Sequence, residues 1–124
     1  MLLIVDDEKD IQILGASVVE RCFNLTVHKV GSMTEAKQFL EEHSPDFALL
    51  DLNLPDGSGF DLVPMLKAKN KEVVFAFITA FDQCKERNRA RELGAVGVLG
   101  KPFKSDELAQ LIKEMLKVKQ VENS

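Results

Sequence analysis

Apolar residues gather along the chain in five short runs, separated by longer stretches of mixed polarity. The runs span residues 2–5, 25–30, 47–50, 73–78 and 96–99. All but the second are almost continuously hydrophobic, as expected of strands that are covered by helices on both faces. In the second run, polar residues separate Leu25, Val27 and Val30, so we expect that strand to lie at the edge of a sheet.

The stretches between the runs have helical periodicity and contain residues that commonly start or stop helices. Ser32 precedes Glu35 by three residues, a spacing typical of a capping box, and Asp61 and Ser105 are two further candidate caps. Gly94 follows a highly charged segment and is a suitable C-terminal stop. The predicted helices span about residues 8–22, 33–42, 62–69 and 83–93, and a last helix begins at about residue 105.

Strand and helix alternate five times within 124 residues. Because crossovers between parallel strands are right-handed, this order predicts an α/β fold with a parallel sheet and helices on both faces. The length fits one domain. We expect that domain to span residues 1–118, with 119–124 as a frayed tail or the start of a linker.

Composition narrows the class of protein further. The 16 basic and 20 acidic residues give a net charge of −4, so electrostatics provides no reason to expect direct binding to nucleic acid or to a membrane. The first residues lack the basic start and long apolar stretch of a signal peptide, so we expect a cytoplasmic protein. Cys22 and Cys84 have no partner at metal-ligand spacing and are interpreted as ordinary reduced thiols.

Polar residues follow four of the five predicted strands directly. These residues are Asp6-Asp7-Glu8, Asp51, Thr79-Ala80 and Lys101-Pro102. The carboxyl ends of parallel strands share one edge of the sheet, where open α/β proteins bind their ligands. Gathered there, Asp6, Asp7 and Asp51 would repel one another by about 1–4 kcal/mol per pair, so a cation is needed. Mg²⁺ prefers such oxygen ligands and suits this edge better than zinc, while Lys101 adds a fixed positive charge.

The same groups suit a phosphoryl group as substrate. Asp51 can act as the nucleophile toward phosphorus, and Mg²⁺ and Lys101 can neutralise charge on the transferred oxygens. The Thr79 hydroxyl and the Ala80 backbone N–H can donate hydrogen bonds to those oxygens. No other general acid or base is evident, since His28 and His43 lie on the predicted edge strand and at a helix end. The residues therefore indicate a phosphoryl acceptor rather than a kinase.

Four motifs together resemble the receiver domains of two-component response regulators over essentially the whole chain. They are Asp6-Asp7, residues 51–59 (DLNLPDGSG), Thr79-Ala80 and Lys101-Pro102-Phe103. The resemblance implies that Asp51 is the phosphorylation site and that Asp7 and Asp51 bind Mg²⁺ directly, with Mn²⁺ as a substitute. It also implies that Asp6 acts through water and that the main-chain carbonyl of Asn53 is a further ligand. The phosphoryl group would then lie among Asn53, Thr79, Ala80 and Lys101, with a cis bond before Pro102.

The resemblance has further implications for fold and partners. It implies a flavodoxin-like, doubly wound (βα)5 sandwich, similar to chemotaxis receivers, whose five parallel strands have the order 2-1-3-4-5. The phosphoryl donor would be a sensor histidine kinase or a histidine phosphotransfer protein. The recipient of the signal would be a downstream effector or a fused output domain, and homodimerisation on phosphorylation is a further expectation. The domain would accept the phosphoryl group and lose it slowly, rather than act as an enzyme.

One position departs from the family's usual pattern. Receiver domains commonly carry an aromatic residue three positions before the lysine, and here that residue is Val98. Thr79 and Val98 are therefore the expected switch positions, on the face formed by the fourth helix, fifth strand and fifth helix. Phe81 and Phe103 are alternative moving or docking side chains near the same edge. Phe81 is also expected to shield the aspartyl phosphate from water and to slow its hydrolysis.

Three other interpretations were weighed against this one. Because Val98 replaces the aromatic residue, the chain could be a receiver-like module that docks a protein without phosphorylation. A phosphatase with an aspartyl nucleophile is disfavoured, since it would require a second aspartate at the position of Asn53. A role for Asp6, Asp7 and Glu8 as helix caps alone is also disfavoured, because a single acidic residue would suffice.

Overall fold

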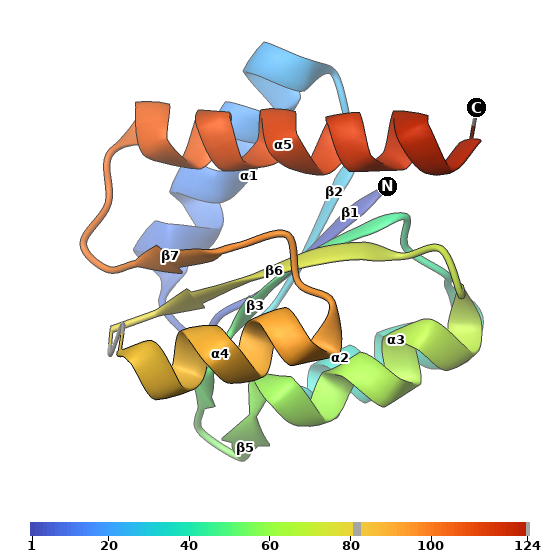
Figure 1. Cartoon of the computed structure of the whole chain (residues 1–124). Coiled ribbons are helices and arrows are strands. Elements are labelled where there is room, and N and C mark those ends of the chain that lie inside the picture. The colour runs from blue at the N-terminus through green and yellow to red at the C-terminus, as the bar shows by residue number, and fades with distance from the viewer. Residues whose placement is uncertain (81–82, 124) are drawn as a thin grey trace.

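The computed structural model describes residues 1–80 and 83–123, with side chains through residue 119. Its centre is a five-stranded parallel sheet in the order β2-β1-β3-β6-β7 (Figure 1). The strands are β1 (Leu2–Val5), β2 (Val27–Val30), β3 (Phe47–Asp51), β6 (Val74–Thr79) and β7 (Val98–Gly100). The helices are α1 (Lys9–Phe23), α2 (Met33–Glu42), α3 (Val63–Lys69), α4 (Cys84–Leu93) and α5 (Ser105–Asn123).

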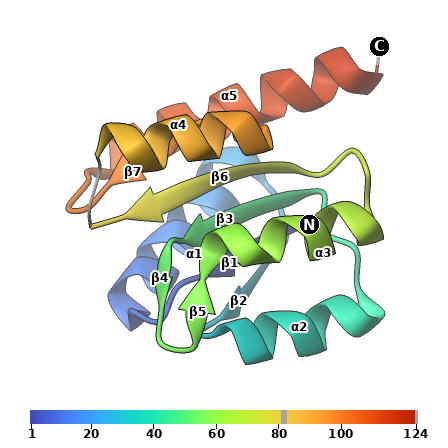
Figure 2. The same ribbon diagram turned by 60° about the horizontal axis from the view of Figure 1, so that its bottom comes forward.

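A short antiparallel hairpin follows β3 and was not predicted from the sequence. It consists of β4 (Asn53–Leu54) and β5 (Gly57–Ser58), and Figure 2 shows it beyond the arrowhead of β3. A turn of 3₁₀ helix, η1 (Gly59–Leu62), then leads into α3. Because β4 and β5 stand apart from the main sheet, β6 and β7 are its fourth and fifth strands in chain order. The predicted order 2-1-3-4-5 is thus confirmed.

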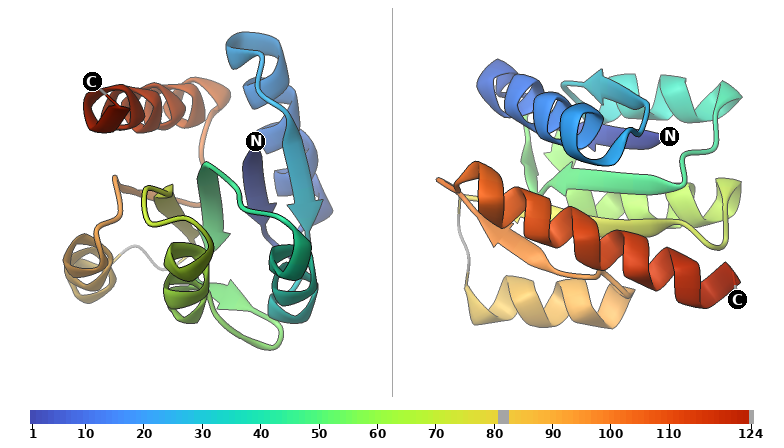
Figure 3. Two further views of the ribbon diagram at one scale, coloured as in Figure 1. Left: turned by 90° about the vertical axis from the view of Figure 1, so that its right-hand side faces the viewer. Right: turned by 90° about the horizontal axis from the view of Figure 1, so that it is seen from above.

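Helices cover both faces of the sheet in two layers. α1 and α5 lie on one face, while α2, α3 and α4 lie on the other (Figures 1 and 3). Side chains alternate between the two faces of a strand, so Leu49 packs in the core beneath α1 and α5 and Leu50 packs in the opposite core. Both side chains are fully buried. Burial on both faces explains why the central strands are continuously hydrophobic.

The helix ends agree with the sequence prediction in part. Ser32 caps α2, since its Oγ accepts a hydrogen bond from the Glu35 N–H at 3.1 Å. The Glu35 carboxylate accepts from the N–H of Gly31 at 3.3 Å, one residue before the predicted partner. Gly94 ends α4 in a left-handed conformation with φ 96°, as predicted. Side-chain oxygens thus satisfy free backbone groups at the start of α2, whereas the backbone N–H of Gly94 does so at the end of α4.

Two predicted caps are wrong. The segment before α3 begins as the 3₁₀ turn η1, and Ser58 caps it by accepting from the N–H of Phe60 at 3.2 Å, which displaces Asp61 from that role. Ser105 is the first residue of α5 rather than its cap. The Glu107 carboxylate accepts a hydrogen bond from the N–H of Lys104 at 3.0 Å. Lys104, the residue directly before the helix, thus occupies the cap position that was predicted for Ser105.

Several smaller features complete the description of the fold. β2 is the edge strand, as predicted, and the rings of His28 and His43 stack on Phe39 with centroid distances of 4.1 and 4.4 Å. Cys22 and Cys84 are exposed free thiols. α5 continues to Asn123, through most of the segment expected to be a tail or linker. No helix in the described part of the chain has the length and hydrophobicity needed to cross a bilayer.

Candidate functional site

Three carboxylates meet at the carboxyl edge of the sheet. β1 and β3 are neighbours paired in register, with Val5 opposite Leu50, so the residues that follow each strand emerge side by side. One carboxylate oxygen from each of Asp6, Asp7 and Asp51 lies within 4.8 Å of the other two. Asp6 and Asp51 are buried, whereas Asp7 is exposed. The structure thus brings together the acidic residues that the sequence predicted for a metal and leaves the cluster open to solvent on one side.

Lys101 supplies the positive charge of the site. Its Nζ lies 2.9 Å from Oε1 of Glu8, 3.0 Å from Oδ2 of Asp6 and 3.2 Å from Oδ2 of Asp51. The Lys101 backbone N–H donates to the carbonyl of Thr79 at 2.8 Å, which fixes the loop after β7 against the end of β6. The peptide bond between Lys101 and Pro102 is cis, as the resemblance implied. The lysine is therefore held over the carboxylates from a third strand end.

Burial and charge perturb the titration of two groups in this cluster. Burial raises the pKa of Asp6 above its ordinary value of 3.8, and the negative charge of Asp51 adds to this effect, although hydrogen bonds from Glu8 and Lys101 oppose it. Burial alone would lower the pKa of Lys101, but its contacts with Glu8, Asp6 and Asp51 outweigh burial and raise that pKa. The lysine is thus firmly protonated, and the buried aspartate is short of compensating positive charge.

The two oxygens of Asp6 have different surroundings. Oδ1 accepts a hydrogen bond from the backbone N–H of Glu8 at 2.9 Å. The buried Oδ2 has the ion pair with Lys101 but no well-aligned hydrogen bond among the described residues. A buried carboxylate oxygen in this state has unused capacity to accept a hydrogen bond or to interact with a cation.

The backbone after Asp51 folds tightly around its carboxylate. The N–H of Asn53 donates to Oδ1 of Asp51 at 3.0 Å, and the N–H of Gly59 donates to the carbonyl of Leu52 at 3.1 Å. A side chain at Gly59 would collide with the carbonyl of Asp51, so only glycine allows this close approach. Leu52 and Leu54 are buried while Asn53 between them is exposed. Asn53 therefore lies beside the acidic cluster, as predicted for a phosphoryl-binding and metal-ligating residue.

Thr79 and Ala80 occupy the end of the next strand. Asp51 pairs with Ile78 across β3 and β6, so Thr79 lies one residue beyond that pair. Thr79 is fully buried, whereas Ala80 is exposed. Thr79 and Asn53 both line a cavity of about 370 Å³ between the hairpin and the start of α4. The structure thus places two of the four predicted phosphoryl-binding residues, Asn53 and Thr79, on one hollow near Asp51.

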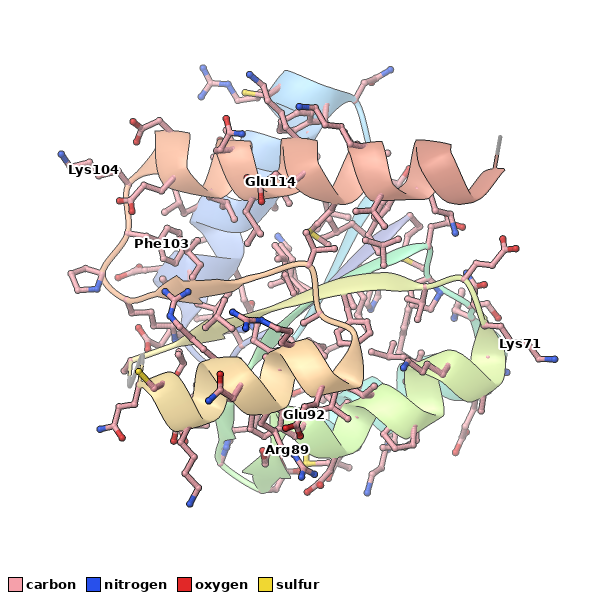
Figure 4. The ribbon with its side chains drawn as sticks, viewed as in Figure 1. Lys71, Arg89, Glu92, Phe103, Lys104 and Glu114 are labelled. Atoms are coloured by element: carbon pink, nitrogen blue, oxygen red, sulfur yellow. The ribbon has the colours of Figure 1, made fainter. Side chains whose placement is uncertain are left out.

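The predicted switch positions lie on adjacent strands. Val98 in β7 pairs with Phe77 of β6, two residues before Thr79, and it is partly buried against the core beneath α2, α3 and α4. Phe103 is partly buried against the other core, on the loop between β7 and α5 that Figure 4 shows. Phe81, proposed as a second moving residue and as a shield, lies outside the described residues.

Two acidic residues that lie at the site were not predicted from the sequence to take part in its chemistry. Glu8, interpreted there as one of three possible helix caps, contacts Lys101 directly and makes no side-chain cap of α1. Glu86 of α4 lines the same cavity as Thr79 and Asn53, and its buried Oε2 has no hydrogen-bond partner among the described residues. The position of Glu8 after two acidic residues was a usable signal, whereas no pattern in the sequence links Glu86 with the strand ends.

Fold and site together define a doubly wound α/β protein with an acidic edge, where two buried aspartates lie in contact with one lysine. The chain belongs to the response regulator receiver domain family, which it matches over residues 2–113. Among curated relatives, it is 33% identical over 120 residues to the response regulator protein PilR of Pseudomonas aeruginosa and 32% identical over 117 residues to the response regulator SaeR of Staphylococcus aureus.

The alignments cover most of this chain but only part of those relatives. The chain is covered to 97% by the match with PilR and to 93% by the match with SaeR, but it spans only 27% and 50% of their lengths. Among solved structures, the non-phosphorylated HemR receiver domain from Leptospira biflexa superposes with a TM-score of 0.78 at 34% identity. That match covers 93% of this chain and 92% of the HemR domain. The similarity therefore concerns the receiver domain as a unit.

Proposed function

We propose that this receiver domain accepts a phosphoryl group on Asp51 in a Mg²⁺-dependent reaction. The observation that carries the proposal is the position of Asp51, which is buried, clustered with two other carboxylates and 3.2 Å from Lys101 Nζ. Acids so arranged repel one another unless cations lie among them, and one lysine does not balance them. A divalent cation among them would supply the missing positive charge and would also balance the negative charge of a transferred phosphoryl group.

The residues of the acidic cluster fit Mg²⁺. All the side-chain donors in the cluster are carboxylate oxygens, the ligand type that Mg²⁺ prefers, and one exposed side leaves room for the waters that it retains. Oδ2 of Asp6, which has the ion pair with Lys101 but no hydrogen-bond partner among the described residues, is a further acceptor within this cluster. Asp7 and Asp51 would hold the ion directly, with Asp6 acting through water and the carbonyl of Asn53 as a further ligand; Mn²⁺ would substitute. When bound, the ion supplies positive charge to the phosphoryl oxygens.

The chain's own residues account for the remaining chemistry. A carboxylate oxygen of Asp51 attacks phosphorus, a P–O bond forms, and the bond from phosphorus to the donor's imidazole nitrogen breaks, so the electron pair leaves with the histidine. Lys101, already within contact of Asp51, neutralises one phosphoryl oxygen. The Thr79 hydroxyl and the Ala80 N–H donate hydrogen bonds to the others. The protein positions the groups, and no separate general acid is required.

We further propose that the domain works as a switch rather than as an enzyme that turns over substrate. A sensor histidine kinase or a histidine phosphotransfer protein would donate the phosphoryl group in the cytoplasm. The face formed by α4, β7 and α5 would pass the signal to an effector or a fused output domain, with a homodimer as one possible form. Val98 on this face supports a second candidate function, protein docking without phosphorylation, since an aliphatic residue stands at the usual aromatic position.

The test is mass spectrometry of the intact protein after incubation with acetyl phosphate. We expect one added phosphoryl group in the presence of Mg²⁺, none in excess chelator, and none in the variant Asp51→Asn. Asp61→Asn is the matched control, because Asp61 is an exposed aspartate of η1 outside the acidic cluster. An adduct that persists in Asp51→Asn would place the acceptor elsewhere. No adduct at all, with Mg²⁺ binding intact, would favour the docking module.

A further inference from the structure

The hairpin after Asp51 is anchored at its tip as well as at its base. At the base, the N–H of Asn53 bonds to Asp51 and the N–H of Gly59 bonds to Leu52, as described above. The hairpin itself is minimal, with two antiparallel residue pairs. At the tip, Asp56 reaches across to the beginning of α2, which precedes it by 23 residues in the chain. The hairpin and α2 lie side by side in Figure 2.

Asp56 uses both carboxylate oxygens at this helix end. Oδ1 accepts from the N–H of Met33 at 2.9 Å, while Oδ2 accepts from the N–H of Thr34 at 3.0 Å and from its hydroxyl at 2.7 Å. These hydrogen bonds to the charged form lower the pKa of Asp56 although its side chain is exposed. Ser32 satisfies the next free N–H, that of Glu35. Asp56 therefore completes the N-terminal capping of α2 from outside the helix.

A second contact holds the same two segments together. Gly57 lies directly against Met33, since a side chain at position 57 would overlap the Met33 sulfur. Met33 is buried in the core beneath α2, α3 and α4. The tip of the hairpin is thus fixed between a charged clamp and a packed core side chain, while Asn53 at its base is exposed beside the acidic cluster. Any shift of the tip will move the Asn53 backbone, because Asn53 pairs with Ser58 across the hairpin.

We propose that Asp56 is a positioning residue for the Asp51 site. By clamping the hairpin to α2, it holds the backbone of Asn53 in the place where its carbonyl serves the Mg²⁺ ion. This inference rests on the proposed function. According to this proposal, the exposed Asp56 contributes to the affinity for Mg²⁺ without touching the ion. The first residues of α2, to which Asp56 is bonded, then help to hold the site in place. Outer groups that orient metal ligands commonly have such effects.

The test compares Mg²⁺ binding and phosphorylation in matched variants of the full chain. Asp56→Ala removes the clamp, Asp56→Asn keeps one acceptor oxygen, and Thr34→Val removes a single hydrogen bond to Asp56. Ser32→Ala is the control, because it weakens the same helix end without touching the hairpin. We expect Asp56→Ala to weaken Mg²⁺ affinity roughly tenfold, with intermediate losses in the other two variants and no loss in Ser32→Ala.

Two measurements distinguish positioning from general destabilisation. Calorimetric titration gives the Mg²⁺ affinity, and nuclear magnetic resonance follows the Asn53 amide during the same titration. The rate of phosphorylation by acetyl phosphate should recover in Asp56→Ala at saturating Mg²⁺, while the Mg²⁺ concentration that gives half the maximal rate rises. Thermal unfolding of each variant measures stability separately. If Asp56→Ala does not unfold cooperatively, Asp56→Asn and Thr34→Val still test the proposal.

The outcomes separate this inference from the proposed function. If the parent chain shows no Mg²⁺-dependent phosphorylation, the proposed function is overturned and this inference falls with it. If the parent is phosphorylated but Asp56→Ala and Asp56→Asn bind Mg²⁺ like the parent, this inference alone is overturned. Equal losses of affinity in Asp56→Ala and Ser32→Ala would also overturn it, because the cause would then be a weakened α2 rather than a displaced hairpin.

Discussion

Replacing Lys101 by methionine removes the positive charge from the acidic cluster while keeping most of the side chain's volume. In the parent, Lys101 Nζ lies within 3.2 Å of three carboxylates, and its side chain is only 10% exposed. Without it, Asp6 and Asp51 remain buried next to each other with no other ion-pair partner among the described residues. Breaking a buried ion pair in this way costs about 3–5 kcal/mol. We expect about 3 kcal/mol here, since the third partner, Glu8, is more than half exposed.

Such a loss is large enough to measure by thermal unfolding. For a domain of this size, about 3 kcal/mol corresponds to a decrease in Tm of roughly 10 °C. The chain contains neither Trp nor Tyr, so far-UV circular dichroism is the suitable probe. Lys104→Met is the matched control, because Lys104 lies near the same loop and points away from the protein (Figure 4). Its removal should change stability by no more than about 0.5 kcal/mol.

Magnesium should reverse much of the defect. In chelator, Lys101→Met should unfold well below the parent. At saturating Mg²⁺ the two should approach each other, because the ion supplies the missing positive charge and binds the folded state selectively. The variant should therefore gain more in Tm from Mg²⁺ than the parent gains. An unchanged Tm of Lys101→Met in chelator, or an equal gain from Mg²⁺ in both proteins, would refute the view that these carboxylates are under-compensated.

Three further predictions concern the site and the core. Burial raises the pKa of Asp6 above its ordinary value of 3.8. In metal-free protein, protonated Asp6 therefore stabilises the folded state fully when the pH is below 3.8. This contribution to the free energy of unfolding is lost as the pH rises through the raised pKa. Urea unfolding at pH values from about 4 to 7 should show this loss in the parent but not in Asp6→Asn, and identical profiles would contradict it. Gly59→Ala should cost about 1–3 kcal/mol through overlap with the carbonyl of Asp51, whereas Gly31→Ala, with 3.6 Å to its nearest neighbours, should unfold like the parent. Leu49→Ala should cost about 2–5 kcal/mol in chemical unfolding because its side chain is fully buried, whereas Ile13→Ala, at a position 62% exposed, should cost little.

The parts of the fold that could be predicted from the sequence are those in which hydrophobic pattern alone decides the structure. Leu49 and Leu50 are buried on opposite faces of the sheet, and this two-sided burial leaves a continuous apolar run that is easy to recognise. The acidic cluster was predictable for a related reason. Asp6 and Asp51 directly follow such runs, so the parallel arrangement of the strands alone brings them to one edge.

Features that depend on contacts between distant segments could not be predicted in this way. The cap at Asp61 was wrong because Ser58 begins a 3₁₀ turn there, a choice governed by how the hairpin returns to the core. Asp56 follows a proline in a turn-forming sequence, and nothing local indicates that it caps a helix 23 residues earlier. Glu86 lines the cavity beside Thr79 only because α4 packs at that distance from the hairpin.

The sheet divides the protein into two apolar cores, and this division has a consequence for how a signal can spread. Along the chain, α1 and α5 follow β1 and β7 and lie on one face of the sheet, while α3 and α4 follow β3 and β6 and lie on the opposite face (Figure 3). Lys101 lies on the loop that leads to α5, and Asp51 ends β3, the strand that precedes α3. The ion pair between them therefore connects segments that lead to opposite faces of the sheet. The proposed phosphorylation of Asp51 would therefore occur at a junction that contacts both helical layers, so both could respond to it.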